Sequence, residues 1–435
     1  MLSNNGKISL LINVKRRVSI GGTDLFRPIQ YIGSKIKLAE RIASHICSYE
    51  SSGVVLDPFS GTGVMGQEFA KRGWKVISSD ALNFCNIMAR ATLGIGKKTD
   101  DKLEQEWNSL QKDAENIPAP KKWTGILQTE KQCIEEEDAQ NLISLEKNYP
   151  RRTTKETMST SRHHKIWRLT DVFAGTYLGV KQSVDLDRYR WALEQRKSAM
   201  SSWCYDSILT ALMSAASNAS YSAGKHFAQF HNLKNEVTEF HKERLIQDRQ
   251  IEIKQHTTES LASIINASNQ SGSGHQQLNG PMEELLGETF HFDWIYADPP
   301  YTAQQYSRFY HLLESYASTK PIRLMHQKGE PTQGLIPPRE DRHQSRFSKK
   351  TTIESAFKDL ITLSEKCDAN LAISYSTSRK RNSRMISLDK LRLLLESTFE
   401  VEMIRFDHKY REFNKAELSD SSDSEDVLLL CRRKS

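Results

Sequence analysis

The chain has 435 residues, enough for one large core with an inserted module. No run of eighteen or more apolar residues occurs, which excludes a transmembrane helix, and the order of charges near the N-terminus is not that of a secretory signal, so we expect a cytoplasmic protein. The net charge of +7 suits a polyanionic partner, and six scattered cysteines without metal-ligand spacing predict idle thiols and no metal site.

The N-terminal part of the chain follows the pattern of a parallel sheet with crossover helices. Apolar residues at helical spacing predict a helix over 36–47, and short apolar runs predict strands over 54–56 and 75–78. Each strand is followed by a predicted helix, over 64–72 and 81–93. This strand–helix–strand–helix order predicts an α/β fold with a parallel sheet.

The middle of the chain breaks this pattern. It is mostly polar and charged, apart from one apolar helical stripe over 204–215. The segment 255–280 is rich in Ser, Asn, Gln, Gly and Thr, and we interpret it as a flexible linker. We therefore divide the chain into an N-terminal tail, a discontinuous catalytic domain and an inserted module: 1–25, 26–96 with 285–435, and 97–284.

Strand signals return in the C-terminal part. Residues 306–316 carry apolar side chains on one helical face, and 388–395 are also predicted to be helical. The last two strands are separated by an acidic, serine-rich link over 418–426, which fits a long antiparallel hairpin. The predicted strands of this part are 292–297, 371–375, 401–406 and 427–431.

A glycine-containing loop, Asp57-Pro58-Phe59-Ser60-Gly61-Thr62-Gly63, joins the first predicted strand to its helix. Glycines let the backbone turn sharply and pass close to a ligand, and open parallel sheets bind ligands beyond the carboxyl ends of their strands. Asp80 ends the next strand, where its carboxylate can accept hydrogen bonds from two ribose hydroxyls. The loop lacks both the third glycine of a dinucleotide fingerprint and the Gly-Lys-Ser/Thr of a phosphate-binding loop. A nucleoside without phosphates, such as S-adenosylmethionine, therefore fits better, although a structural turn with a surface aspartate has the same pattern.

A second loop, Asp298-Pro299-Pro300-Tyr301, directly follows an apolar strand. The lone pair of the adenine amino group is delocalised into the ring, so the nitrogen is a poor nucleophile. A carboxylate and a backbone carbonyl that accept its two hydrogens would bias the nitrogen towards a tetrahedral geometry. Consecutive prolines stiffen the loop and preorganise these acceptors, and the ring of Tyr301 can stack on a base flipped out of a duplex. A proline-rich turn after a strand is common, but its occurrence together with the first loop is much more specific.

With these two loops and Tyr31-Ile32-Gly33-Ser34-Lys35, the chain resembles the Dam-like adenine-specific DNA methyltransferases of restriction–modification systems. The resemblance covers 26–96 and 285–435, and the order of the motifs is that of the alpha group of amino methyltransferases. It implies that Tyr31 and Lys35 lie against the cofactor. It also implies a Rossmann-like S-adenosylmethionine-dependent methyltransferase fold, with a seven-stranded mixed sheet, a C-terminal antiparallel hairpin and an inserted target-recognition domain.

The resemblance further implies the reaction and the partners. The expected reaction is site-specific methyl transfer to the N6 amino group of adenine in double-stranded DNA, with a cognate restriction endonuclease encoded separately. Alternatives on the same fold are the 4-amino group of cytosine, RNA, or a glutamine amide. Asp298 favours adenine, because Ser is commoner at this position in relatives acting on cytosine and Asn in those acting on glutamine. A catalytically idle DNA-binding protein is the alternative from a different class.

Three basic stretches are candidates for phosphate contacts. Lys225 and His226 lie in a glycine-containing loop after the striped helix, Arg346, Lys349 and Lys350 end a second stretch that begins at Arg339, and a third spans 379–384. Each stretch alone is more typical of a solvated face. As a group they could supply sequence-independent attraction to DNA.

Overall fold

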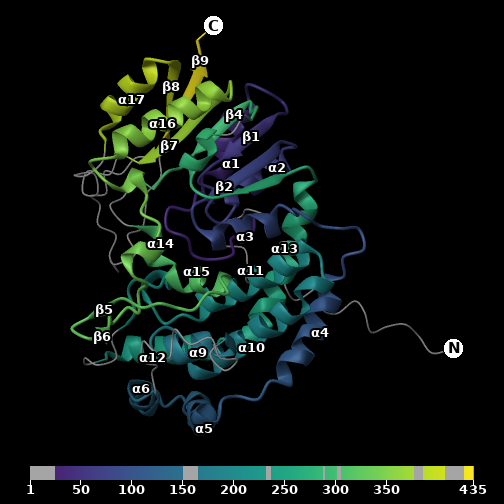
Figure 1. Ribbon diagram of the computed structural model, residues 1–435, viewed down its shortest axis with the longest axis vertical. Coiled ribbons are helices and arrows are strands. Elements are labelled where there is room, and N and C mark those ends of the chain that lie inside the picture. Colours follow the sequence, from purple (N-terminus) through teal and green to yellow (C-terminus); the bar gives the residue numbers. More distant parts are fainter. Residues whose placement is uncertain are drawn as a thin grey trace, which may run out of the picture.

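The computed structural model describes residues 25–149, 165–231, 237–287, 290–300, 305–376, 386–406 and 426–434. A seven-stranded sheet with the order β3-β2-β1-β4-β7-β9-β8 occupies one half of the molecule, and a mass of helices occupies the other (Figure 1). The first five of these strands run parallel to one another, whereas β9 pairs antiparallel with both β7 and β8. The strands are β1 (Val54–Asp57), β2 (Lys75–Asp80), β3 (Gln276–Asn279), β4 (Trp294–Ala297), β7 (Asn370–Ser376), β8 (Phe399–Phe406) and β9 (Asp426–Arg433).

Helices cover both faces of the sheet because successive strand residues point to opposite sides. Val55 and Trp294 belong to an apolar cluster with α1 and α2, whereas their neighbours Leu56 and Ile295 belong to a cluster with α16 and α17. Sheet residues in both clusters are buried, so the sheet forms the middle of three layers. The four helices are α1 (Ala39–Cys47), α2 (Val64–Lys71), α16 (Ile353–Lys366) and α17 (Leu388–Glu396).

The inserted region is mostly helical where the structure describes it. Its longest helices, α10, α11 and α13, pack against one another, and α3 packs against α11 and α13. Within the described ranges, no helix has both the length and the apolar character needed to cross a bilayer. The helices of this half are α3 (Asn83–Thr92), α4 (Leu103–Glu115), α5 (Lys121–Glu135), α6 (Ala139–Lys147), α9 (Arg168–Phe173), α10 (Val180–Arg196), α11 (Ser202–Ala219), α12 (Glu239–Arg249) and α13 (Ile253–Ser271).

The predicted flexible linker over 255–280 is wrong, because most of it forms α13. This helix buries a stripe that includes Ile253, Leu261 and Ile264. Its many hydroxyl side chains do not break the helix, because several donate to the carbonyl four residues earlier, as Thr257 does to Ile253 at 2.7 Å. Tertiary packing therefore overrides a composition that resembles a linker.

The predicted end of the insert at residue 284 is also too late. Strand β3 lies within the predicted insert, yet it pairs with β2 and forms one edge of the sheet. In addition, α11 and α13 share one apolar core with α3 and α15 (His311–Ala317). The insert and the α/β unit are thus packed on a common core.

The helix predicted over 306–316 is two helices. The first, α14 (Tyr306–Phe309), ends at Tyr310, whose φ of −119° and ψ of 23° are not helical, and α15 starts one residue later. The hydroxyl of Tyr310 accepts a hydrogen bond from the Ile32 N–H at 2.8 Å and donates to the Gln30 carbonyl at 3.1 Å. The break therefore coincides with the contact that holds the N-terminal motif.

The packing of α13 predicts that Ile264→Ala lowers the free energy of unfolding by about 2–5 kcal/mol, because Ile264 is fully buried. Urea denaturation followed by circular dichroism measures the change. The control Gln270→Ala, at an exposed position of the same helix, should change stability by no more than about 0.5 kcal/mol. Equal, small effects of both substitutions would contradict a packed helix.

Candidate active site

A single cavity lies beyond the carboxyl ends of β1, β2 and β4. It holds about 970 Å³ of open space, its mouth included, and acidic residues from all three strand ends line it. These are Asp57 at the end of β1, Asp80 at the end of β2 and Asp298 directly after β4. The topology alone brings them together, because parallel strands end at one edge of the sheet.

The loop after β1 needs glycine at two positions. Gly61 and Gly63 have φ values of 51° and 77°, and Gly63 begins α2 as its N-cap. A Cβ atom on Gly61 would lie 3.0 Å from the ring of Tyr31, and one on Gly63 would lie 3.1 Å from the Thr92 hydroxyl. Glycine therefore lets the loop turn between the N-terminal motif and α3.

Asp80 is fixed by the backbone around it. One carboxylate oxygen accepts the Gly61 N–H at 2.9 Å and the other accepts the Leu82 N–H at 2.8 Å. Burial raises the pKa of Asp80 to about 6, although these hydrogen bonds act in the opposite direction. Each oxygen retains a lone pair for a ligand hydroxyl, so the carboxylate can bind a ribose without moving.

Asp57 is buried deeper, and its carboxylate accepts the Phe59 N–H at 3.2 Å. Burial raises its pKa well above the usual value, and the charges of Asp298 and Asp80 raise it further. This mutual repulsion favours a cationic ligand over an anionic one.

Lys35 lies next to Asp298 although the two are far apart in the sequence. Its ammonium donates to both carboxylate oxygens of Asp298 at 2.8 Å and to the Gly33 carbonyl at 3.2 Å. Only 3% of Lys35 is exposed, compared with 19% of the Asp298 side chain. The buried lysine therefore holds the exposed edge of the carboxylate towards the cavity.

The cavity fits S-adenosylmethionine in charge and in hydrogen bonding. This molecule is cationic at its sulfonium and ammonium groups, and the cavity is lined by more carboxylates than cations. Ser34 and Ser60 line it as well, and their buried hydroxyls have no hydrogen-bond partner within the described part of the chain. Buried hydroxyls without partners are unfavourable, so a polar ligand would satisfy them.

Most of the residues predicted from the two loops and the N-terminal motif share this one cavity. Gly63 shapes the loop as the N-cap of α2, while Tyr301 lies outside the described residues. The residues that line the cavity are Tyr31, Lys35, Asp57, Phe59, Gly61, Asp80, Asp298, Pro299 and Pro300.

The sequence did not indicate a second group of lining residues, which follows the loop 298–301, the candidate catalytic loop. Phe347, in the short helix η6 (Arg346–Ser348), packs edge-to-face on Phe59 with a centroid distance of 5.2 Å. The Ser348 hydroxyl donates a long hydrogen bond of 3.4 Å to the Pro300 carbonyl. No motif marks these residues, and only the fold places them. The group comprises Gln305, Tyr306, Ser307, His343, Ser345 and Phe347.

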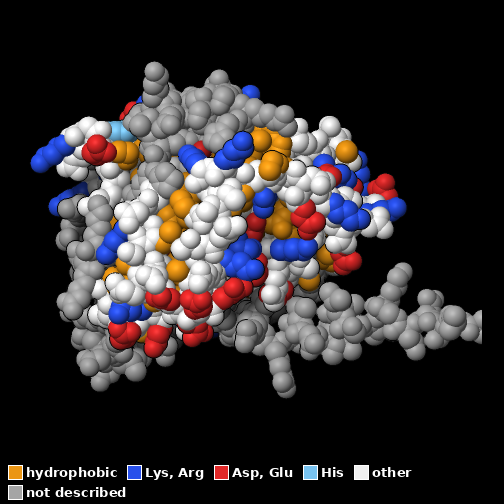
Figure 2. Space-filling view, turned by 90° about the horizontal axis from the view of Figure 1, so that it is seen from below, with side chains coloured by type: hydrophobic (Ala, Val, Ile, Leu, Met, Phe, Trp, Pro, Cys, Tyr) orange, Lys and Arg blue, Asp and Glu red, His pale blue; other side chains and the backbone are white. Residues whose placement is uncertain are grey.

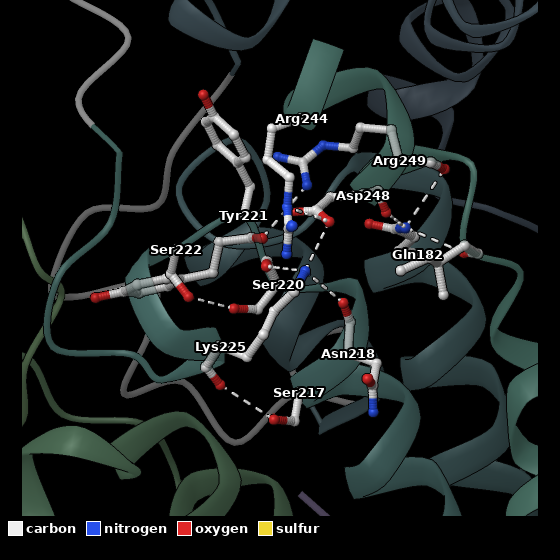
Figure 3. Close-up of polar contacts among 12 residues, drawn as sticks. Gln182, Ser217, Asn218, Ser220, Tyr221, Ser222, Lys225, Arg244, Asp248 and Arg249 are labelled. Atoms are coloured by element: carbon white, nitrogen blue, oxygen red, sulfur yellow. Dashed lines mark hydrogen bonds and ion pairs between the residues drawn. The ribbon is translucent and has the colours of Figure 1, made fainter. Parts of the chain in front are cut away.

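The prediction that Lys225 and His226 contact phosphates is wrong, because both are buried. Figure 3 shows the Lys225 side chain directed towards Asp248, Asn218 and Ser220. The Lys225 ammonium donates to Asp248 at 2.7 Å and to the carbonyls of Asn218 and Ser220. Burial lowers the pKa of Lys225 to about 8 and that of His226 to about 4. Lys225 therefore serves to hold the turn η3 (Ala223–Lys225), in which Gly224 and Lys225 both have positive φ.

The other predicted basic residues lie differently. Arg346 is paired with Asp359 and lies 3.9 Å from Glu283, so its charge is largely neutralised. Lys349 is half-buried and Lys350 is exposed, and both remain predicted phosphate contacts. The third stretch, 379–384, lies outside the described residues.

The helical half offers no uniformly basic surface on the side shown in Figure 2, where acidic and basic side chains are interspersed. Within the described ranges, no group of three or more His, Cys, Asp or Glu side chains is arranged to hold a metal ion.

The strand order and the acidic cavity fit the Rossmann-like fold of a methyltransferase. Residues 31–145 match the family model of the D12 class N6 adenine-specific DNA methyltransferase. This match confirms the resemblance seen in the sequence motifs and supports adenine methylation of DNA. It includes Lys35 and Asp80 but ends before Asp298, so the role of the second loop rests on its own residues and geometry. No curated protein matches the chain.

The structural role of Lys225 predicts that Lys225→Met lowers the free energy of unfolding by about 1–3 kcal/mol, because the carbonyls of Asn218 and Ser220 lose a donor and the buried Asp248 keeps only Arg244 as an ion-pair partner. The salt dependence of DNA binding should not change, since the ammonium does not reach the surface. Unchanged stability together with weaker DNA binding would contradict this assignment.

Proposed function

We propose that the chain transfers a methyl group from S-adenosylmethionine to the N6 amino group of adenine in duplex DNA. The observation that carries the proposal is the shared cavity of Asp80 and Asp298. The carboxylate of Asp80 is suited to bind a ribose and that of Asp298 an exocyclic amine, and both residues line the same cavity. Cofactor and target base would therefore meet there.

The cofactor side of the cavity is formed by the N-terminal motif and the loop after β1. Asp80 would accept hydrogen bonds from the ribose hydroxyls, while Tyr31 and Phe59 would contact the apolar parts of the ligand. Ser34 and Ser60 would donate to the methionine carboxylate. When bound, the cofactor supplies a methyl group attached to a sulfonium, which is a strong electrophile.

On the target side, Asp298 would accept one hydrogen of the adenine amino group and the Pro299 carbonyl would accept the other. Lys35 fixes the carboxylate of Asp298 through both of its oxygens, so the acceptor is in place before the base arrives. These two contacts would direct the nitrogen lone pair at the methyl group, and Tyr301 would stack on the flipped base. After transfer, the surplus amine proton leaves through the hydrogen bond to Asp298 towards solvent.

The proposal extends to the biological setting. By resemblance, the reaction is the site-specific modification of a restriction–modification system, with a separately encoded endonuclease as partner. Lys349 and Lys350, which follow η6 beside the catalytic loop, would contact the phosphate backbone.

The mechanism predicts that Asp298→Asn lowers the rate of methyl transfer by about a hundredfold or more, because the amide accepts the amine hydrogen less strongly. The affinity for S-adenosylmethionine should stay within about threefold, since Asp80 and the loop are intact. Isothermal titration measures the affinity. Mass spectrometry of nucleosides from unmethylated duplex DNA measures the product.

The expected product is 6-methyladenine, formed by the intact protein and nearly absent with Asp298→Asn. Full activity of the variant would remove Asp298 from the mechanism. Formation of 4-methylcytosine would contradict the assigned base. No product at all, despite cofactor binding, would contradict duplex DNA as the substrate, and RNA or a protein would be tested next.

The raised pKa of Asp80 predicts a pH-dependent cofactor affinity. Ribose hydroxyls donate best to the ionised carboxylate, so binding is strong above pH 6 and weakens as the pH falls through 6. The dissociation constant should be about tenfold higher at pH 5 than at pH 8. In Asp80→Asn the affinity should be weak at both pH values. A wild-type affinity that is constant over this range would contradict the role of Asp80.

A further inference from the structure

Three arginines that do not line the cavity lie in the two segments that carry its lining residues Ser307 and His343, and we call this region the rim. Arg308 is exposed on α14, the first helix after the catalytic loop, and Arg339 is exposed at the start of η5 (Arg339–Asp341). Arg342 is half-buried directly after η5, and its backbone N–H donates to the Arg339 carbonyl at 3.3 Å. Two separate segments of the chain thus bring these side chains together.

A hydrogen bond next to the arginines fixes the two segments. The Ser307 hydroxyl donates to the His343 carbonyl at 2.7 Å, and both residues line the cavity. Arg308 follows Ser307 and Arg342 precedes His343 in the sequence. Arg308 and Arg342 are therefore each adjacent in sequence to a residue of the cavity wall, and Arg339 lies three residues before Arg342.

The acidic residues of the same turn do not neutralise these arginines. The sequence Arg-Glu-Asp-Arg over 339–342 has two residues of each sign, but a fourth arginine, Arg323, pairs with Asp341 at 2.8 Å and with Glu340 at 3.3 Å. Across the described ranges, no ion pair joins Arg308, Arg339 or Arg342 to a carboxylate. The turn thus presents excess positive charge.

The pKa shifts of Arg342 and His311 indicate that the positive charges of the arginines lie close enough to repel one another. Burial lowers the pKa of Arg342, and the charges of Arg308 and Arg339 lower it further, with partial compensation by Glu340. His311, buried beneath them, has a pKa lowered to about 4, chiefly by burial and also by Arg342 and Arg308. Such repulsion is unfavourable unless an anion binds.

We propose that Arg308, Arg339 and Arg342 form a binding site for the DNA phosphates that flank the base in the cavity. The proposal rests on the proposed function and adds the contacts that hold the backbone of the substrate. Guanidinium groups suit phosphodiesters because they present planar, paired N–H donors.

The acidic cavity and the basic rim together explain how a flipped nucleotide would bind. The cavity is acidic, with Asp57, Asp80 and Asp298 in its wall, so it would repel a phosphate but accept a neutral base with an amino donor. The basic rim lies immediately outside. A flipped nucleotide would therefore place its base inside and its phosphates on the arginines.

The test is the salt dependence of DNA binding by the full chain. A fluorescein-labelled 30-base-pair duplex of mixed sequence is titrated with protein at several NaCl concentrations, and anisotropy gives the dissociation constant. In Arg308→Ala/Arg339→Ala/Arg342→Ala, affinity at low salt should fall at least about tenfold. The slope of log affinity against log salt should fall by about 2–3, since about three phosphate contacts are lost.

A matched control removes the same charge elsewhere. Arg392, Arg432 and Arg433 are exposed on α17 and β9, at the far end of the molecule in Figure 1, and each is ion-paired. Their triple alanine variant should keep the wild-type slope. The variant Arg308→Lys/Arg339→Lys/Arg342→Lys should keep most of the slope, and thermal melting and cofactor titration report on folding in each case.

The outcomes separate this proposal from the proposed function. A reduced slope in the rim variant alone, with intact cofactor binding, supports the site. Equal slopes in the rim variant, the control and the wild type would overturn it. If the rim variant binds DNA less well but wild-type protein methylates no DNA, the phosphate site stands and the proposed reaction fails.

Discussion

The arrangement of the whole site depends on the ion pair between Lys35 and Asp298. The two residues are 263 positions apart, and their contact joins the N-terminal motif to the end of β4. A buried ammonium without its carboxylate costs several kcal/mol, so the pair constrains both segments together. It also gives the carboxylate one orientation, in which its exposed part faces the cavity. The N-terminal motif and the loop after β4 are therefore held together in one wall of the cavity.

The helices after the catalytic loop extend this constraint to the rest of the molecule. Tyr310 holds the N-terminal motif, and the Glu314 carboxylate accepts the Asn83 and Phe84 N–H groups at the start of α3. The Phe227 N–H, from the turn after α11, donates to the Phe309 carbonyl at 2.7 Å. Helix α3, the insert and the N-terminal motif thus meet at α14 and α15, which explains why the insert shares a core with α3.

The sequence predicted those parts of the fold whose local pattern agrees with their tertiary role. Apolar runs marked β1, β4 and β7, because central strands are buried on both faces. Strand β3 was not predicted, because Gln276–Asn279 is a polar strand at the edge of the sheet. Helix α13 was not predicted, because its many hydroxyl side chains, which donate to the helix backbone, give the segment the composition of a linker. In the site, chemistry identified Asp80 and Asp298, and only resemblance identified Lys35. The sequence around Lys225 does not predict its burial, and the sequences around Arg308 and Arg342 do not predict that the two come close together. Both depend on packing between segments that are distant in the chain.

The central claim is that one cavity holds the nucleoside of the cofactor on Asp80 and presents its methyl group to Asp298. A crystal structure with S-adenosylhomocysteine tests this most directly. We predict ribose hydroxyls within about 3.2 Å of the Asp80 carboxylate and the sulfur on the side of the cavity that faces Asp298. A nucleoside bound elsewhere, or one whose sulfur faces away from Asp298, would contradict the account.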